Sequence, residues 1–108
     1  MKQFTVRRVP PDLRRMAKEY HEFHGDTNIT VAAVHVFHYK INDEIPHTVE
    51  AIETHFTDRH GKRMATMLDV WTDANGKPYI QEEEDTAGEN AEEVVQAWKD
   101  SCLYCTDA

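Results

Sequence analysis

Two cysteines near the end of the sequence form its most motif-like arrangement of reactive side chains. Cys102 and Cys105 are separated by two residues, a spacing at which two thiolates can share a zinc ion or form a redox pair. Both fall at the C-terminal end of an expected helix, where the helix dipole disfavours a thiolate. They also continue the apolar stripe of Val94, Val95 and Trp98. We therefore expect them to be small core residues.

Two H-x-F-H segments supply four of the seven histidines. On a helix, His21 and His24 would lie on one face and could bind a metal together. On a strand, His35 and His38 would point to opposite faces of the sheet and could not. His24 falls in the apolar stripe of its helix, so we expect it to be packed and hydrogen-bonded, with His21 at the flank of the stripe.

These residues support one metal hypothesis, a structural or catalytic zinc site. Its ligands would be His21, His24, Cys102 and Cys105, with His35 and His38 as further candidates. The His–Glu–x–His segment at 21–24 is one residue short of the zinc-protease spacing. We expect no cofactor, and zinc is the alternative.

Other catalytic chemistry has no assembled signature in the sequence. Asp69 interrupts an apolar strand and Glu53 flanks an apolar stripe, so either could be a buried acid with a raised pKa or simply lie at the margin of the core. Ser101 is the only serine, which makes a Ser-His-Asp hydrolase a poor candidate. The four glycines are too scattered to form a phosphate-binding loop. The sequence thus favours a protein that is not an enzyme.

The net charge of −8 is distributed unevenly over the 108 residues. Residues 1–41 carry a net +3, residues 42–64 a net −2 and residues 65–108 a net −9. The acidic maximum contains seven acids and no base: Glu82, Glu83, Glu84, Asp85, Glu89, Glu92 and Glu93. Such asymmetry is typical of proteins with charged partners.

The acidic segment carries the main functional hypothesis. We expect a small acidic binding protein, an inhibitor or adaptor, whose C-terminal half docks on a basic surface of a protein partner, with carboxylates in the place of nucleic-acid phosphates. A solvated loop followed by a helix start is the plainer interpretation of the same residues. Nucleic-acid binding is the other alternative, opposed by the net charge. It would use the basic residues Arg7, Arg8, Arg14, Arg15 and Lys18.

Length and hydropathy bound the class of protein. A chain of 108 residues fits one domain. The longest uninterrupted apolar run is the four residues from Val31 to Val34, and the first residues show no apolar leader, so we expect a cytoplasmic protein with no membrane partner. Two cysteines in that compartment would be reduced thiols rather than a disulfide framework.

The periodicity of the apolar residues predicts the elements that position these side chains. Strands are expected at 2–9, 30–41, 64–72 and 77–82, although 30–41 could also be helical. An Asn75-Gly76 turn joins the last two strands, and Pro78 places the returning strand at an edge.

Three helices are expected between and after these strands. The first runs from Asp12 as N-cap to Gly25 as its stop, the second from Pro46 to before Gly61, and the third from Asn90 onward. The order β-α-β-α-β-β-α predicts a single α+β domain over 1–108. In it, three helices would pack against a mixed or antiparallel sheet of about four strands.

Overall fold

Two helices and a six-stranded antiparallel sheet make up the described part of the chain, in a computed structural model that describes residues 3–41, 45–81 and 86–104. The strand order is β1-β2-β3-β4-β5, and β6 pairs with β4. The elements are β1 Gln3–Arg7, α1 Pro11–Phe23, β2 Thr27–Ile41, β3 Ile45–Thr57, β4 Arg63–Thr72, β5 Pro78–Ile80, β6 Ala87–Gly88 and α2 Ala91–Tyr104.

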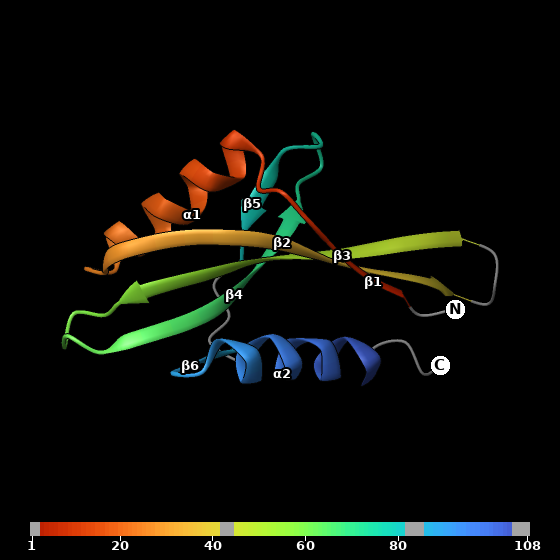
Figure 1. The fold of residues 1–108 in the computed structure, drawn as a ribbon. Helices are drawn as coiled ribbons and strands as arrows, with labels where there is room; N and C mark the ends of the chain where they lie inside the picture. Colours follow the sequence, from red (N-terminus) through yellow and green to blue (C-terminus); the bar gives the residue numbers. More distant parts are fainter. Residues whose placement is uncertain (1–2, 42–44, 82–85, 105–108) are drawn as a thin grey trace.

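The helices cover opposite faces of the sheet, α1 above it and α2 below it in Figure 1. The core under α1 includes Leu13, Ala17, Val34, Val36, Ile52 and Leu68. The core over α2 includes Phe37, Ala51, Ala65, Met67, Val94 and Trp98. Successive residues of the central strands alternate between these cores, because side chains along a strand point to opposite faces.

The expected architecture is wrong in its second helix. The sequence predicts a helix from Pro46 to before Gly61, with Val49, Ile52 and Phe56 in its apolar stripe. Instead, Ile45–Thr57 forms β3, which pairs with β2 and β4. Because helices cover both faces of the sheet, β3 carries apolar side chains on both faces, and the alternation that marks a half-buried strand is lost. The domain therefore has two helices rather than three, and six strands rather than about four.

Several local predictions are confirmed. β2 is an inner strand between β1 and β3, and β5, with Pro78 at its start, is at the end of the strand order. Gly76, at φ +82°, closes the expected β4–β5 turn, a left-handed conformation that favours glycine. Asn90 caps α2, its Oδ1 accepting a hydrogen bond from the Glu93 amide at 3.1 Å.

The ends of α1 differ from the prediction. The helix begins at Pro11, with Pro10 rather than Asp12 as its N-cap, so Asp12 lies inside the first turn. It ends at Phe23, and Gly25 then takes a left-handed φ of +81°. His24 consequently lies outside the helical wheel that placed it in the core, and it is exposed, whereas His21 is buried.

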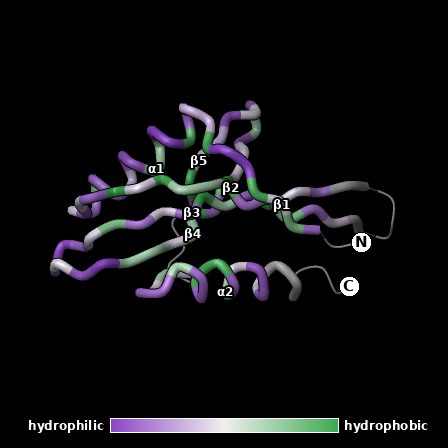
Figure 2. Tube along the Cα trace, in the orientation of Figure 1, coloured by the Kyte–Doolittle hydropathy of each residue, from purple (hydrophilic) through white to green (hydrophobic). Residues whose placement is uncertain are grey.

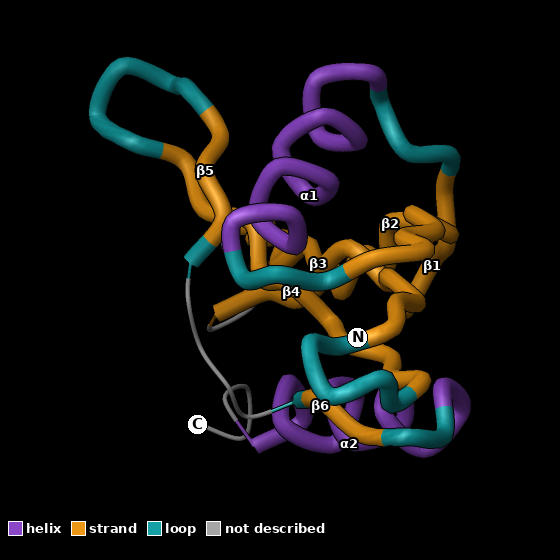
Figure 3. The backbone as a smooth tube through the Cα atoms, turned by 90° about the vertical axis from the view of Figure 1, so that its left-hand side faces the viewer, coloured by secondary structure: helices purple, strands orange, loops and turns teal. Residues whose placement is uncertain are grey.

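Two hairpins give the molecule its elongated outline, 46 × 31 × 21 Å. The long β2–β3 hairpin crosses the whole view in Figure 1, and the β4–β5 hairpin projects from the rest of the chain in Figure 3. Figure 2 shows hydrophilic residues along much of α1 and the more hydrophobic residues in the sheet and on the inner side of α2. Among the described residues, neither helix is long and apolar enough to cross a membrane.

Candidate functional site

The start of α2 carries the part of the predicted acidic docking surface that the structure describes. Glu89, Glu92 and Glu93 are all exposed. Residues 82 to 85, which are Glu82, Glu83, Glu84 and Asp85, lie outside the described residues. We call Glu89, Glu92 and Glu93 the α2 acidic surface.

All three of these carboxylates also have local roles. Glu92 and Glu93 lie in the first turn of α2, where negative charge favours the helix. Glu89 Oε1 lies 2.7 Å from Lys62 Nζ, in a pair whose side chains are each about 60% exposed, so that pair contributes little stability. The acidic surface is thus compatible with both the docking hypothesis and the plainer interpretation.

A hydrogen-bonded chain of three side chains lies on the other face of the sheet. His21, which is 1% exposed, bridges α1 to β3. Its Nδ1 lies 2.8 Å from Asp26 Oδ2 and its Nε2 lies 2.7 Å from Thr54 Oγ1. With Nδ1–H donating to the carboxylate, Nε2 accepts the hydrogen of the Thr54 hydroxyl.

The Asp26–His21–Thr54 chain has the order of a nucleophile triad, but its burial opposes catalysis. Thr54 has no exposed surface, and a nucleophile must reach its substrate. Burial lowers the pKa of His21 below its ordinary value, although the hydrogen bond and charge of Asp26 oppose this shift. The three side chains therefore act as a buried link between α1 and β3 in which His21 is neutral.

A second polar cluster lies between the sheet and α2. The Glu53 carboxylate accepts hydrogen bonds from Nε2 of His35 at 2.8 Å and from Nε2 of His55 at 2.6 Å. Burial on its own would raise the pKa of Glu53, but the bonds from His35 and His55 outweigh it, so the pKa lies below its ordinary value. This outcome is the reverse of the raised pKa considered for Glu53 from the sequence. The buried Nδ1 of His35 has no hydrogen-bond partner within the described structure.

An open cavity lies at the C-terminal end of α1, beside His21. It has a volume of about 430 Å³. Its walls include Tyr20, His21, His24, Phe56, Arg59 and His60. Both ring nitrogens of His21 already form hydrogen bonds, Nδ1 with Asp26 and Nε2 with Thr54. His21 therefore offers no free catalytic base to this cavity.

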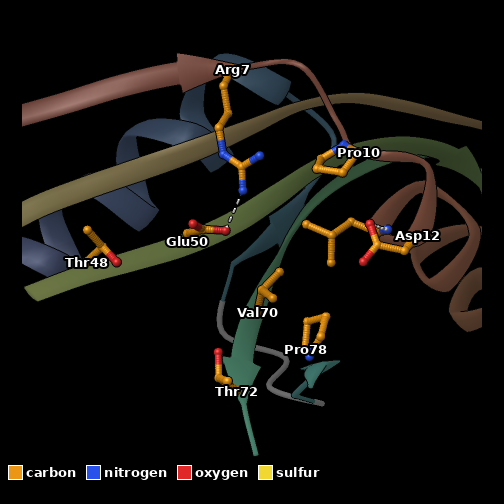
Figure 4. A pocket seen from close by; sticks show the side chains of 9 residues that line it. Arg7, Pro10, Asp12, Thr48, Glu50, Val70, Thr72 and Pro78 are labelled. Carbon is orange, nitrogen blue, oxygen red and sulfur yellow. Dashed lines mark hydrogen bonds and ion pairs between the residues drawn. The ribbon is translucent and has the colours of Figure 1, made fainter. Parts of the chain in front are cut away.

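A cavity of about 340 Å³ lies at the other end of α1 and is shown in Figure 4. Arg7 from β1 reaches Glu50 of β3 across it, at 2.8 Å. Pro10, Val70 and Pro78 form its apolar walls. The one basic group that lines the cavity is paired with Glu50, and Asp12 adds a second carboxylate, so the lining offers no unpaired cation that would select an anionic ligand.

The proposed zinc ligands that the structure describes belong to opposite sides of the sheet. His21 and His24 belong to the α1 side of the sheet, whereas Cys102 lies on α2, across the sheet, and Cys105 lies outside the described residues. His35 and His38 point to opposite faces of β2, as expected: His35 bonds Glu53 and His38 bonds the Thr5 hydroxyl. Within residues 3–41, 45–81 and 86–104, no three His, Cys, Asp or Glu side chains are placed to hold a metal ion.

The basic residues proposed for nucleic-acid binding are partly engaged within the protein. Arg7 pairs with Glu50, Arg14 donates to the Val31 carbonyl at 3.2 Å, and Arg15 lies 3.9 Å from Glu19. Arg8 and Lys18 are exposed. Nucleic-acid binding through these residues stays a prediction.

Sequence reasoning missed both polar clusters because each joins residues far apart in the chain. Assigning β3 as a strand would have placed Glu53 and His55 on one face and Thr54 on the other, since strand side chains alternate. The pairing partners on α1 and β2 would still have been unknown. Comparison of the chain with protein-family models, curated proteins and solved structures finds no match.

Proposed function

We propose that this protein is a non-enzymatic binding protein whose α2 acidic surface docks on a basic surface of a protein partner. The observation that carries the proposal is the separation of net charge between the two helices. Glu92 and Glu93 are exposed on α2, which carries a net negative charge, whereas the exposed bases Arg14, Arg15 and Lys18 of α1 are matched in number by the exposed acids Asp12, Glu19 and Glu22.

This separation gives the molecule an oriented charge distribution. A surface of one sign raises the rate of association with a surface of the opposite sign and disfavours like-charged partners. The form of binding that we propose is that of an inhibitor or adaptor occupying a basic, nucleic-acid-binding surface. The buried state of Thr54 and His21 supports a binding role over a catalytic one.

A matched pair of variants tests the proposal. Glu92→Gln/Glu93→Gln removes two charges from α2, and Glu19→Gln/Glu22→Gln removes two from α1 while leaving the same net charge. We expect partners cross-linked to the wild-type protein in its source extract to be recovered with the α1 variant and lost with the α2 variant. Cross-linking carried out at roughly 0.5 M salt, where the Debye length is only a few ångströms, should recover much less of the same partners.

Two further results would bear on the proposal. Displacement of the partner by duplex DNA would support occupation of a nucleic-acid-binding surface. Retention of the partner by Glu92→Gln/Glu93→Gln, or an affinity indifferent to salt, would overturn it. Glu92→Asp/Glu93→Asp keeps the charge and should keep binding, which separates the loss of charge from any change in α2 itself.

A further inference from the structure

Two large aromatic side chains are exposed side by side on the β4–β5 hairpin. Trp71 is 49% exposed and Tyr79 is 44% exposed. They are register partners on adjacent antiparallel strands, so their side chains lie on the same face of the hairpin. This hairpin is the one that projects from the body of the molecule in Figure 3. We call the pair the aromatic platform.

The platform lies on the α2 side of the sheet. Asp69 faces α2, because its Oδ1 accepts a hydrogen bond from Trp98 Nε1 at 2.9 Å. Trp71 follows two residues later on the same strand and therefore points to the same face. Val70 and Ile80, on the alternate positions, pack against the α1 core. The two rings thus point to the α2 side of the sheet, while β5 itself lies next to α1.

The net charge of the protein bears on the occupant of the platform. At −8, it favours a cationic partner and repels a nucleic acid. Among cationic side chains, the planar guanidinium of arginine stacks on tryptophan and tyrosine rings better than the compact ammonium of lysine. Exposed Trp and Tyr are also frequent anchors of protein interfaces.

We propose that Trp71 and Tyr79 form a docking platform for arginine side chains of a basic protein segment. This inference rests on the proposed function and names the side chain that its partner presents. The acidic residues would attract and orient the segment, and the two rings would hold the guanidinium groups.

Fluorescence anisotropy with a labelled octa-arginine peptide, and with an octa-lysine peptide of equal charge, tests the platform on the full chain. We expect Trp71→Ala and Tyr79→Ala each to weaken octa-arginine binding by about twofold to fivefold, the range of an exposed cation–π contact. Octa-lysine should lose less. Trp71→Phe keeps a ring and should show an intermediate loss, which guards against misfolding as the cause.

A control variant removes a more exposed aromatic side chain from another part of the molecule. Phe23 is 85% exposed at the end of α1, and Phe23→Ala should bind both peptides like the wild type. Unchanged octa-arginine binding by Trp71→Ala and Tyr79→Ala would overturn the platform. So would stronger binding of a single-stranded oligonucleotide that depends on Trp71.

The same assay separates failure of the platform from failure of the proposed function. If Glu92→Gln/Glu93→Gln weakens the binding of both peptides while the aromatic variants do not, the acidic surface stands and the platform falls. If that variant also binds like the wild type, both fail. A direct signal is available as well, because octa-arginine should quench wild-type tryptophan fluorescence and leave Trp71→Phe, which retains only buried Trp98, unchanged.

Discussion

His21 makes the stability of the protein depend on pH at the level of a single residue. Its pKa is lowered in the folded protein by burial, so below the ordinary value of about 6.5 the unfolded chain binds a proton that the folded chain does not. The contribution of neutral His21 is therefore complete above that pH and is lost as the pH falls below it. Urea denaturation should show a free energy of unfolding that decreases from pH 7.5 to pH 5.5, by at most about 1.4 kcal/mol per pH unit for this group.

A paired substitution identifies the group responsible. His21→Gln should flatten the pH dependence in this interval, whereas His60→Gln, in an exposed turn, should leave the wild-type slope intact. An unchanged slope in His21→Gln would contradict the assignment. Glu53 acts in a separate window: its lowered pKa adds stability that is present above pH 4.5 and is lost as the pH falls through the folded-state value.

Thr54 provides a second test of the buried chain. Thr54→Val keeps the shape of the side chain but leaves Nε2 of His21 as a buried acceptor without a donor, which should cost about 1–3 kcal/mol in the free energy of unfolding. Thr54→Ser retains the hydroxyl and loses one methyl group, so it should cost less, about 1 kcal/mol. Chemical denaturation of both variants at pH 7.5 compares them, and a larger loss in Thr54→Ser than in Thr54→Val would show that packing rather than the hydrogen bond is responsible.

At the scale of elements, Trp98 and Val94 are the buried side chains that attach α2 to the sheet, and Trp98 adds a hydrogen bond. Trp98 is 2% exposed, contacts Phe4 edge to face at 6.1 Å between ring centroids, and donates its indole N–H to Asp69. Trp98→Phe keeps a ring in the core but leaves the partly buried Asp69 carboxylate without the indole donor. Thermal and urea unfolding should show a loss of about 1–3 kcal/mol.

Trp71 supplies the matched control for Trp98. Trp71→Phe makes the same chemical change at a half-exposed position and should alter the free energy of unfolding by no more than about 0.5 kcal/mol. Similar losses in the two variants would show that the Trp98–Asp69 bond contributes nothing specific.

The elements also show where sequence reasoning succeeds and where it fails. α1, β2 and α2 were predictable, because their apolar stripes, Gly25 and the cap at Asn90 are local signals. β3 was not, because each of its faces meets a different helix, and Ile52 and Phe56 fit a helical stripe as well as a strand. Which face a strand buries is decided by elements distant in the chain, and no local pattern contains that information.

At the scale of the whole molecule, the candidate site was predictable in part for the same reason. Charge can be counted along the sequence, so the acidic character of the last 44 residues was evident. Predicting that Trp71 and Tyr79 point to the α2 side would require knowledge of the register between β4 and β5. The bridges from His21 to Thr54 and from His35 to Glu53 require the strand order and the placement of α1. Composition indicated the kind of surface, and topology determined its position.

The two cores should unfold together, because they share the central strands. Ile52 belongs to the α1 core and its neighbour Ala51 to the α2 core, so neither core can lose its sheet surface while the other stays intact. Leu13→Ala, a truncation in the α1 core, should lower the free energy of unfolding by about 2–5 kcal/mol. It should shift the urea midpoint followed by tryptophan fluorescence, which reports the α2 core through Trp98, as much as the midpoint followed by far-ultraviolet circular dichroism. Coincident shifts indicate one cooperative unit, and two separated midpoints would show that the faces of this sheet unfold independently.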